Sequence, residues 1–415
     1  MVGLKQVPVT NETLRQKDLA LVPAPVRTAD LGKYRRKNRK WQGIPSIAIT
    51  ERGIFYCACY SGGEGEGPDN YVVVERSADG RNWSEPIAAV DPEGYVRAFD
   101  MCLWTAPDGR LVLFWSQSFG GFDGRAGVFM SICHNPEEER LKWSRSIRIT
   151  DGVMLNKPII GRHGEWLLAL SLWNNVPCQQ ADMSLRGTHM ISCRNSSAPQ
   201  TEISAGIISN DIIPYAFGQG DLDRRIKLYE ADGTGKHVKD ISFRLRGGFD
   251  IEGRYYDEPM AVQKIDGSLW MLFRLPDGIG EAFSSDEGRS WENIRRAGIW
   301  GPDSRFYIGR LKSGRLLMVN HLPEEGKAKR SNLTAWLSRD DGMSWSGRLI
   351  LDEREDVSYP DAAEDREGNI YIIYDYSRFG RKEILLCSVT EEEILAGKIY
   401  RDASFTKRVI DKAGE

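Results

Sequence analysis

One unit recurs six times along the chain: a turn that ends in glycine, followed by a short and dense apolar run. The six copies occupy residues 52–60, 108–116, 163–171, 266–274, 313–321 and 367–375. Each run is rich in β-branched and aromatic residues and is bounded by turn residues, which is typical of buried strands and not of helices. A strand unit repeated in this way predicts an all-β fold built from similar modules.

The spacing of the copies indicates which repeat architecture they form. Their turn glycines are 56, 55, 103, 47 and 54 residues apart. A blade of four short antiparallel strands needs about 40 to 50 residues, so the spacing predicts a six-bladed β-propeller of four-stranded blades. The one double gap leaves two alternatives, a seventh degenerate blade or a long insertion. Residues 174–253 are richer in Ser, Asn, Asp and Gly, which favours an insertion with some strands of its own.

A second repeat, S-x-D-x-G-x-x-W, is offset from the first. It is complete at residues 284–291 and 338–345, and a copy one residue shorter lies at 77–83. In such a turn the Asp carboxylate accepts backbone N–H groups, Gly takes the positive-φ position and Trp packs back on the strands. These Asp-box turns are therefore predicted to be structural and to carry no chemistry.

Charge and composition exclude several classes of function. The net charge is −3, with acids and bases mixed along the chain, and this does not fit the basic face of a nucleic-acid-binding protein. No stretch reaches the roughly 18 apolar residues that span a bilayer, so no membrane partner is expected. The N-terminus shows no apolar core of a secretory signal, which predicts a cytoplasmic protein unless a leader has been removed.

The chain is predicted to be one domain over residues 1–415, in which an N-terminal extension, 1–34, closes on the last blade. The seven cysteines match no zinc-site spacing and the five histidines are scattered, so no metal and no cofactor are expected. Reduced cysteines fit a cytoplasmic protein. The oligomeric state is not predicted.

The Asp-box turns and the six strand repeats together resemble the sialidase (neuraminidase) superfamily of BNR-repeat proteins, from about residue 35 to residue 399. The resemblance implies a six-bladed propeller that hydrolyses terminal sialic acids with retention, at a site on the propeller axis away from the Asp boxes. The family's site contains a tyrosine nucleophile with a glutamate partner, three arginines that bind the substrate carboxylate, and an aspartic acid/base on a loop of the first blade.

Three residues match these positions, and Glu66 falls at a fourth, where the family has an aspartic acid. Tyr359, in V-S-Y-P-D, matches the nucleophile, and Glu258, in D-E-P-M, matches its partner. Arg330, in K-R-S-N-L-T-A-W, matches the third arginine, and Glu66, in the glycine-rich loop 61–70, falls at the acid/base position. A phenol is a poor nucleophile unless a carboxylate takes its proton, and sialidases are a recognised exception to the two-carboxylate rule of glycosidases. For Glu66 the alternative is a solvated acidic turn.

Two departures from the family pattern affect the predicted substrate. Gly43 stands where the family has the arginine of its R-I-P motif, and the second arginine, expected near Ile279, is missing. A carboxylate held by three guanidiniums is bound through several charge-assisted hydrogen bonds. The two losses therefore predict a terminal sugar that is not a standard sialic acid.

Polar residues next to the apolar strands are further candidates, because charged and amide groups are unusual in buried sequence. The predicted substrate-binding residues are Arg305, Arg97, Asp100, Asn156, Lys157, His321 and Gln42, in addition to Arg330. For each of them the alternative is an ion pair or a hydrogen bond between blades.

These features predict a sialidase-like glycoside hydrolase with a carbohydrate substrate. Tyr359 would attack the anomeric carbon, Glu258 would accept the tyrosine proton, and Glu66 would protonate the leaving oxygen. Two other functions stay open: a polysaccharide lyase acting on uronate-containing glycans, in which Tyr or His moves protons, and a non-catalytic glycan-binding propeller.

Overall fold

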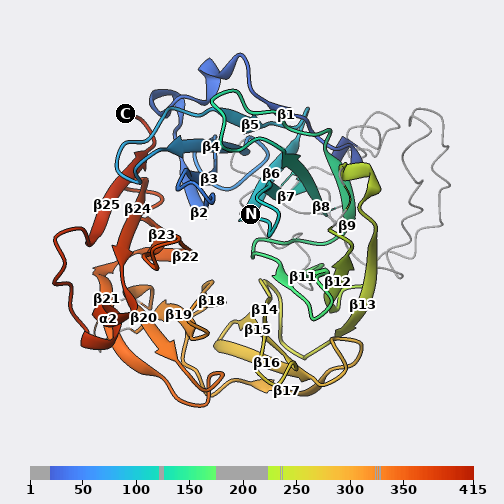
Figure 1. The fold of residues 1–415 in the computed structure, drawn as a ribbon. Helices are drawn as coiled ribbons and strands as arrows, with labels where there is room; N and C mark the ends of the chain where they lie inside the picture. Colours follow the sequence, from blue (N-terminus) through green and yellow to red (C-terminus); the bar gives the residue numbers. More distant parts are fainter. Residues whose placement is uncertain are drawn as a thin grey trace, which may run out of the picture.

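The structure, a computed structural model, describes residues 19–120, 126–173, 223–233, 235, 237–322, 324, 326 and 329–415. In this part of the chain, six antiparallel sheets surround a central axis as the blades of a propeller (Figure 1). The predicted all-β, six-bladed fold is confirmed. None of the described helices is long and apolar enough to cross a membrane.

Each blade uses four strands that follow one another in the sequence. The first three blades contain β2 (Gln42–Ile49), β3 (Phe55–Ser61), β4 (Tyr71–Ser77) and β5 (Ala88–Val90); β6 (Val96–Thr105), β7 (Leu111–Phe119), β8 (Gly127–Cys133) and β9 (Ile147–Asp151); and β10 (Ile159–Ile160), β11 (Trp166–Ser171), β12 (Ile226–Ala231) and β13 (Phe243–Phe249). The innermost strands are β2, β6 and β10.

The last three blades repeat this order around the ring. They contain β14 (Met260–Gln263), β15 (Leu269–Leu275), β16 (Gly278–Ser284) and β17 (Glu292–Arg296); β18 (Tyr307–Arg310), β19 (Leu316–His321), β20 (Ser331–Ser338) and β21 (Ser346–Glu355); and β22 (Val357–Glu364), β23 (Ile370–Tyr376), β24 (Glu383–Val389) and β25 (Phe405–Lys412). A short helix, α2 (Glu391–Ala396), follows β24 and begins with the capping box of Thr390 and Glu393.

The six apolar repeats of the sequence form the second strand of each blade, namely β3, β7, β11, β15, β19 and β23. These strands are buried almost throughout. Each blade packs both of its faces against neighbouring blades, so both sides of its middle strands must be apolar. This is why the runs are continuously hydrophobic and do not alternate with polar residues.

The segment 174–253, predicted as an insertion, contributes two strands to the third blade. β12 pairs with β11, and β13 pairs with β12. Residues 174–222 lie outside the described residues. The double gap between turn glycines thus reflects the long stretch of sequence between β11 and β12, and the described residues contain no seventh blade.

The described part of the N-terminal extension lies on the first two blades. A 3-10 helix (Leu19–Leu21) contacts β6 and β7, and β1 (Val26–Arg27) pairs with β5 as a fifth strand of the first blade. Lys33 and Tyr34, in a second 3-10 helix (Leu31–Tyr34), bind Asp91 next to β5. Residues 1–18 of the extension lie outside the described residues.

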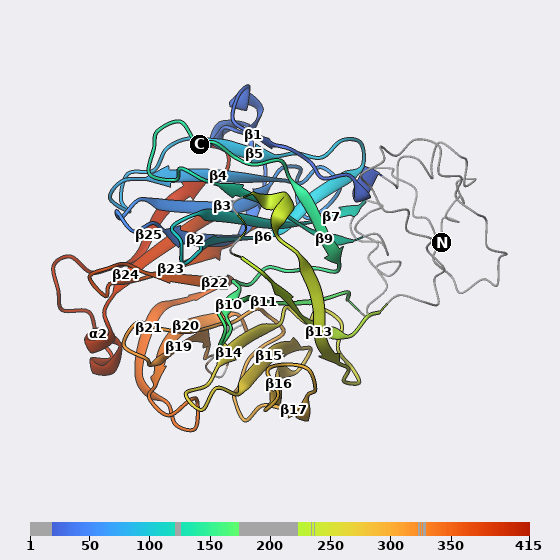
Figure 2. The ribbon, with the colours of Figure 1, turned by 45° about the vertical axis from the view of Figure 1, so that its right-hand side comes forward.

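Ion pairs just after this extension join the first and last blades, which lie side by side in Figures 1 and 2. Arg39, which follows a 3-10 helix (Arg36–Asn38), donates to both carboxylate oxygens of Asp411 on β25 at 2.7 Å and to Glu75 on β4 at 3.0 Å. Arg36 binds the same two carboxylates. All four side chains are largely buried, so this charge-balanced cluster adds to the apolar packing of β2 against β22 and β23 that joins the two blades, which share no strand.

The Asp-box turns have the predicted structural geometry. Asp286 accepts the N–H of Ser290 at 2.9 Å, and Asp340 accepts that of Ser344 at 2.8 Å. These turns lie between the third and fourth strands of their blades, at the same ends of the sheets as the glycine turns of the first repeat. We call this side of the propeller the Asp-box face.

Candidate active site

The inner strands of three blades break their register at the same place, and each break carries a residue in the left-handed region. The breaks separate Gly43 from Ser46, Phe99 from Cys102, and Ser358 from Asp361. The left-handed residues are Ile44 (φ 55°), Asp100 (φ 44°) and Tyr359 (φ 55°), and Glu258, just before β14, has φ 44°. A bulge redirects the side chain that it carries, and strain of this kind gathers at functional sites.

Tyr359 and Glu258 meet as the sequence predicts. The Tyr359 hydroxyl donates to Glu258 Oε1 at 3.0 Å, and Arg274 Nη1 lies 3.0 Å from the hydroxyl and 2.9 Å from the same carboxylate oxygen. The three side chains come from the sixth blade and the fourth blade and are buried. Burial and the neighbouring Glu258 charge hold the pKa of Tyr359 well above its usual range. The phenol therefore gains nucleophilicity only by passing its proton to Glu258.

Arg274 is the second arginine that the sequence analysis did not find. It lies on β15, directly across from Ile279 on β16, where the arginine was expected. Its guanidinium also binds Asp303 at 2.7 Å. The expectation that the site lacks a second arginine is wrong, because the residue stands on the neighbouring strand and reaches the same place.

A third guanidinium comes from Arg378, after β23. Its Cζ lies 5.1 Å from the centre of the Tyr359 ring, and that of Arg330 lies 5.6 Å from it. The Arg378 side chain fills the space beside Gly43, where its Cδ would be 2.3 Å from an added Cβ. The charge missing from position 43 is thus present in the site, and Arg274, Arg330 and Arg378 surround Tyr359.

Glu66 reaches the same site as an ion-pair partner. Its carboxylate accepts a hydrogen bond from Arg378 Nη1 at 2.8 Å, and its side chain is 43% exposed. The loop thus brings a carboxylate to the predicted place, where it is bound to a guanidinium.

Asp100 and Arg97 lie on β6 and are both 4% exposed. Among the described residues, Asp100 has no hydrogen-bond or ion-pair partner, and the Arg97 guanidinium stacks on Phe99 at 4.0 Å. Burial raises the pKa of Asp100 to about 8; Glu258 and Glu66 also raise it, whereas Arg97 and Arg305 lower it. The Asp100 carboxyl is therefore protonated at neutral pH.

This chain resembles several known proteins in its fold. A BNR repeat-like domain matches residues 246–372. Among curated proteins, none matches the sequence significantly. A Dyadobacter fermentans protein of unknown function is 15% identical, with a TM-score of 0.58 over 87% of this chain and 96% of that chain. The Ruminococcus gnavus intramolecular trans-sialidase in complex with oseltamivir carboxylate is 13% identical, with a TM-score of 0.59 over 89% and 98%.

A mutant of the NanB sialidase from Streptococcus pneumoniae is 12% identical, with a TM-score of 0.58 over 94% of this chain and 70% of that chain. The chain is a divergent sialidase-like β-propeller. At these identities the likeness concerns the fold, so the roles of individual residues in this sialidase-like propeller rest on its own geometry.

Three predicted substrate-binding residues of the sialidase-like propeller join its inner strands to one another. Asn156 donates to the backbone carbonyls of Glu258 at 2.9 Å and Pro259 at 3.0 Å, and it accepts from Arg305 at 2.8 Å. Lys157 and Arg305 form ion pairs with the buried Asp361. The contacts between blades that were the alternative for these residues are present, and Asn156 anchors the backbone of Glu258.

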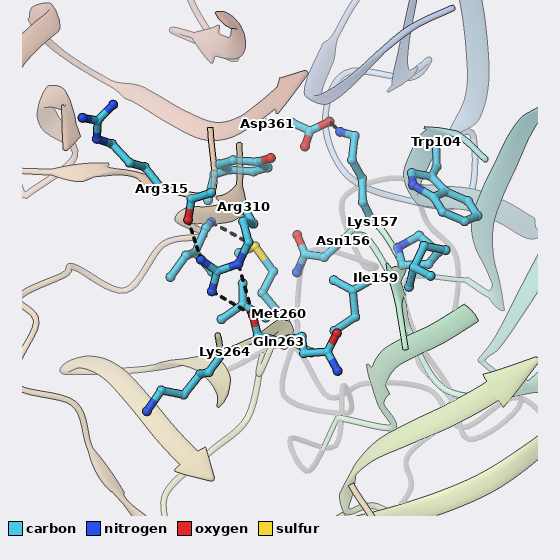
Figure 3. Close-up of a pocket in the computed structure, with 18 of the residues that line it drawn as sticks. Trp104, Asn156, Lys157, Ile159, Met260, Gln263, Lys264, Arg310, Arg315 and Asp361 are labelled. Atoms are coloured by element: carbon cyan, nitrogen blue, oxygen red, sulfur yellow. Dashed lines mark hydrogen bonds and ion pairs between the residues drawn. The ribbon is translucent and has the colours of Figure 1, made fainter. Parts of the chain in front are cut away.

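The same three residues line a cavity of about 790 Å³ that reaches the Asp-box face, where Arg310 and Arg339 also line it. Figure 3 shows Lys157 extending toward Asp361 and Arg310 lying beside Gln263. Tyr359, Glu258 and Arg274 are not among its lining residues. The candidates from the sequence are therefore divided between the two ends of the axial region.

His321 and Gln42 connect blades and are fully buried. A ring nitrogen of His321 lies 2.8 Å from the carbonyl oxygen of Val357, and Gln42 donates to the carbonyl of Lys382 at 2.9 Å. Burial lowers the pKa of His321 to about 4, so the ring is neutral at physiological pH. Both residues support the sixth blade, which carries Tyr359.

Sequence reasoning missed Arg274, Arg378 and Asp303. Arg274 ends the fourth apolar repeat, and an arginine in a strand that is otherwise buried was a usable signal. Arg378 and Asp303 lie in connections whose sequence gives no comparable signal.

Proposed function

We propose that this propeller is a retaining glycoside hydrolase that releases a terminal sugar bearing a carboxylate. One observation carries the proposal: the 3.0 Å hydrogen bond from Tyr359 to Glu258, in a site surrounded by three guanidiniums. Solved structures of the same fold include a sialidase and a trans-sialidase, which supports chemistry at a glycosidic bond.

Tyr359 is the nucleophile in this proposal. Its phenolic oxygen attacks the anomeric carbon while its proton passes to Glu258 Oε1, which removes the obstacle of the high phenol pKa. Arg274 Nη1, 3.0 Å from the phenolic oxygen, stabilises negative charge that develops there. Water then displaces the tyrosine, and two displacements at one carbon retain its configuration.

The guanidiniums select an acidic sugar. Arg330 and Arg378 lie over the Tyr359 ring, and together with Arg274 they can donate several charge-assisted hydrogen bonds to one carboxylate. A substrate other than a standard sialic acid was predicted because the sequence lacks two arginines at the family's positions. Since Arg274 and Arg378 are present in the site, sialosides are tested beside other acidic sugars.

The test is a screen of fluorogenic aryl glycosides of sialic acid, of other keto-acid sugars, of uronic acids and of neutral hexoses. We expect turnover of an acidic glycoside, and a loss of about 10³-fold or more in kcat for Tyr359→Phe. Tyr400→Phe is the control, because Tyr400 is 56% exposed and is not part of the site.

Three outcomes contradict the proposal. Near wild-type turnover by Tyr359→Phe removes the nucleophile. Saturable sugar binding without turnover by the wild-type protein indicates a glycan-binding propeller. Release of an unsaturated product from uronate oligosaccharides indicates a lyase.

A further inference from the structure

We propose that Asp100, and not the loop carboxylate Glu66, donates the proton to the leaving glycosidic oxygen. This assignment rests on the proposed function. It is carried by the position of Asp100 in the propeller repeat, by the absence of a partner for its carboxyl among the residues that the structure describes, and by the ion pair that holds Glu66.

The first observation is that Asp100 occupies, in the second blade, the position of Tyr359 in the sixth. Both residues follow the last regularly paired residue before a register break, both are left-handed, and pairing resumes two residues later, at Cys102 and Asp361. Because the blades are related by rotation about the axis, equivalent bulges present their side chains at the same end of the axial region. Asp100 therefore faces the site of Tyr359 and Glu258 from another blade.

The second observation is that Asp100 differs from the other buried aspartates near the axis. Asp361 accepts hydrogen bonds from Ser46 and Ile47, Asp375 accepts from Ile44 and Ser358, and Asp257 binds Arg254 at 2.7 Å. Asp100 is 4% exposed and has no such partner among the described residues. Its carboxyl oxygens are not among the fully buried side-chain atoms that lack a hydrogen bond, whereas Asp257 Oδ1 and Asp361 Oδ1 are. The unpartnered carboxyl of Asp100 is therefore open to the site, where a substrate oxygen can bind it.

The third observation concerns the proton itself. The charged groups that face Asp100 are Glu258, Arg97, Glu66 and Arg305. Burial and the two carboxylates raise the pKa of its carboxyl to about 8, and the two guanidiniums offset only part of that rise. An acid of this strength carries its proton at neutral pH and can give it to an alkoxide leaving group. Glu66 instead accepts from Arg378 at 2.8 Å, and protonating it would break that ion pair.

The proposed reaction balances as follows. The bond from the anomeric carbon to the leaving oxygen breaks as Asp100 gives its proton to that oxygen. The Tyr359 oxygen bonds to the anomeric carbon and gives its proton to Glu258. In the second half, Asp100 takes a proton from water as the water oxygen attacks the same carbon, and Glu258 returns its proton to Tyr359. Both carboxyl groups thereby regain their starting states.

The test compares two leaving groups on the acidic sugar that the wild-type protein hydrolyses: an aryl group of low pKa and an alkyl group of high pKa. With Asp100→Asn, cleavage of the alkyl glycoside should fall by about 10²- to 10⁴-fold, because the alkoxide needs a proton. The aryl glycoside should still give a burst of free phenol close to that of the wild-type protein. The second half of the reaction, the attack of water on the intermediate, should be slow. A covalent adduct should therefore accumulate on Tyr359 and be detectable by mass spectrometry.

Glu66→Gln is the matched comparison. It should change the alkyl and aryl substrates by the same factor, because Glu66 acts on the position of Arg378. Asp100→Asn and Glu66→Gln are both checked for cooperative thermal unfolding.

The outcomes separate the two proposals. A wild-type protein inactive on every glycoside, or an active Tyr359→Phe, overturns the proposed function and this assignment with it. An active wild type, an inactive Tyr359→Phe and an Asp100→Asn with the leaving-group dependence of the wild type overturn this assignment alone. This assignment alone is also overturned if Glu66→Gln, and not Asp100→Asn, selectively loses activity on the alkyl glycoside.

Discussion

The side chain of Arg378 lies in the space that a side chain at Gly43 would fill, with its Cδ 2.3 Å from the position of an added Cβ. The two residues belong to the sixth blade and the first blade, which are neighbours in the ring. Gly43 stands where the family has an arginine, and its lack of a side chain leaves the space in which Arg378 of the sixth blade extends to Tyr359.

Replacing Gly43 by Ala should displace Arg378. The backbone at Gly43 is not in the left-handed region, so alanine is compatible with it, and the main effect is a contact that Arg378 must relieve by moving. We expect kcat/KM for the acidic glycoside to fall by about 10- to 100-fold, as small misplacements of binding groups do. Steady-state kinetics measure the effect. Gly298→Ala is the control, because no atom lies within 4 Å of its added Cβ. An unchanged KM would show that Arg378 does not bind substrate.

Replacing Arg39 by Met should destabilise the closure of the ring. Arg39, Glu75 and Asp411 are at most 2% exposed, and removing the cation leaves two buried carboxylates that, in the described part of the chain, are paired with Arg36 alone. Removing one partner of a buried ion pair costs about 3–5 kcal/mol. Because Arg36 still neutralises part of the remaining negative charge, we expect the free energy of unfolding to fall by about 3 kcal/mol, the lower end of this range. Urea unfolding measures it. Arg296→Met, which breaks the exposed pair with Asp277, should change stability by less than about 1 kcal/mol. Equal effects of the two variants would contradict the closure by Arg39.

Asp100→Asn should raise stability at alkaline pH. The folded-state pKa of Asp100 is raised to about 8, so between about pH 4 and pH 8 the folded protein holds a proton that the unfolded chain has lost. Its contribution to stability therefore falls as pH rises through that window. Asparagine removes the ionisation, and we expect a gain of about 1–3 kcal/mol at pH 8 and almost none at pH 4. Denaturant unfolding at both pH values checks this, with Asp277→Asn as an exposed control. A gain independent of pH would show that Asp100 does not titrate in this range.

The sequence alone determined the parts of this protein that depend on local patterns. The glycine turns and apolar runs gave the second strand of every blade, because strand formation and hairpin turns are encoded within about ten residues. The Asp boxes were readable for the same reason, since the turn satisfies its own backbone through one carboxylate. Tyr359 and Glu258 were predicted through short motifs, although they lie 101 residues apart.

The tertiary structure alone decided which charges gather around Tyr359. A guanidinium stands at the end of a long side chain, so Arg274 and Arg378 reach the site from positions that no motif marks. It also decided to which end of the axis each polar residue turns, because one bulge redirects side chains along an inner strand. Thus Asp100 reaches the site beside Glu258, while Lys157 and Arg305 bind Asp361 and line the cavity that opens on the Asp-box face.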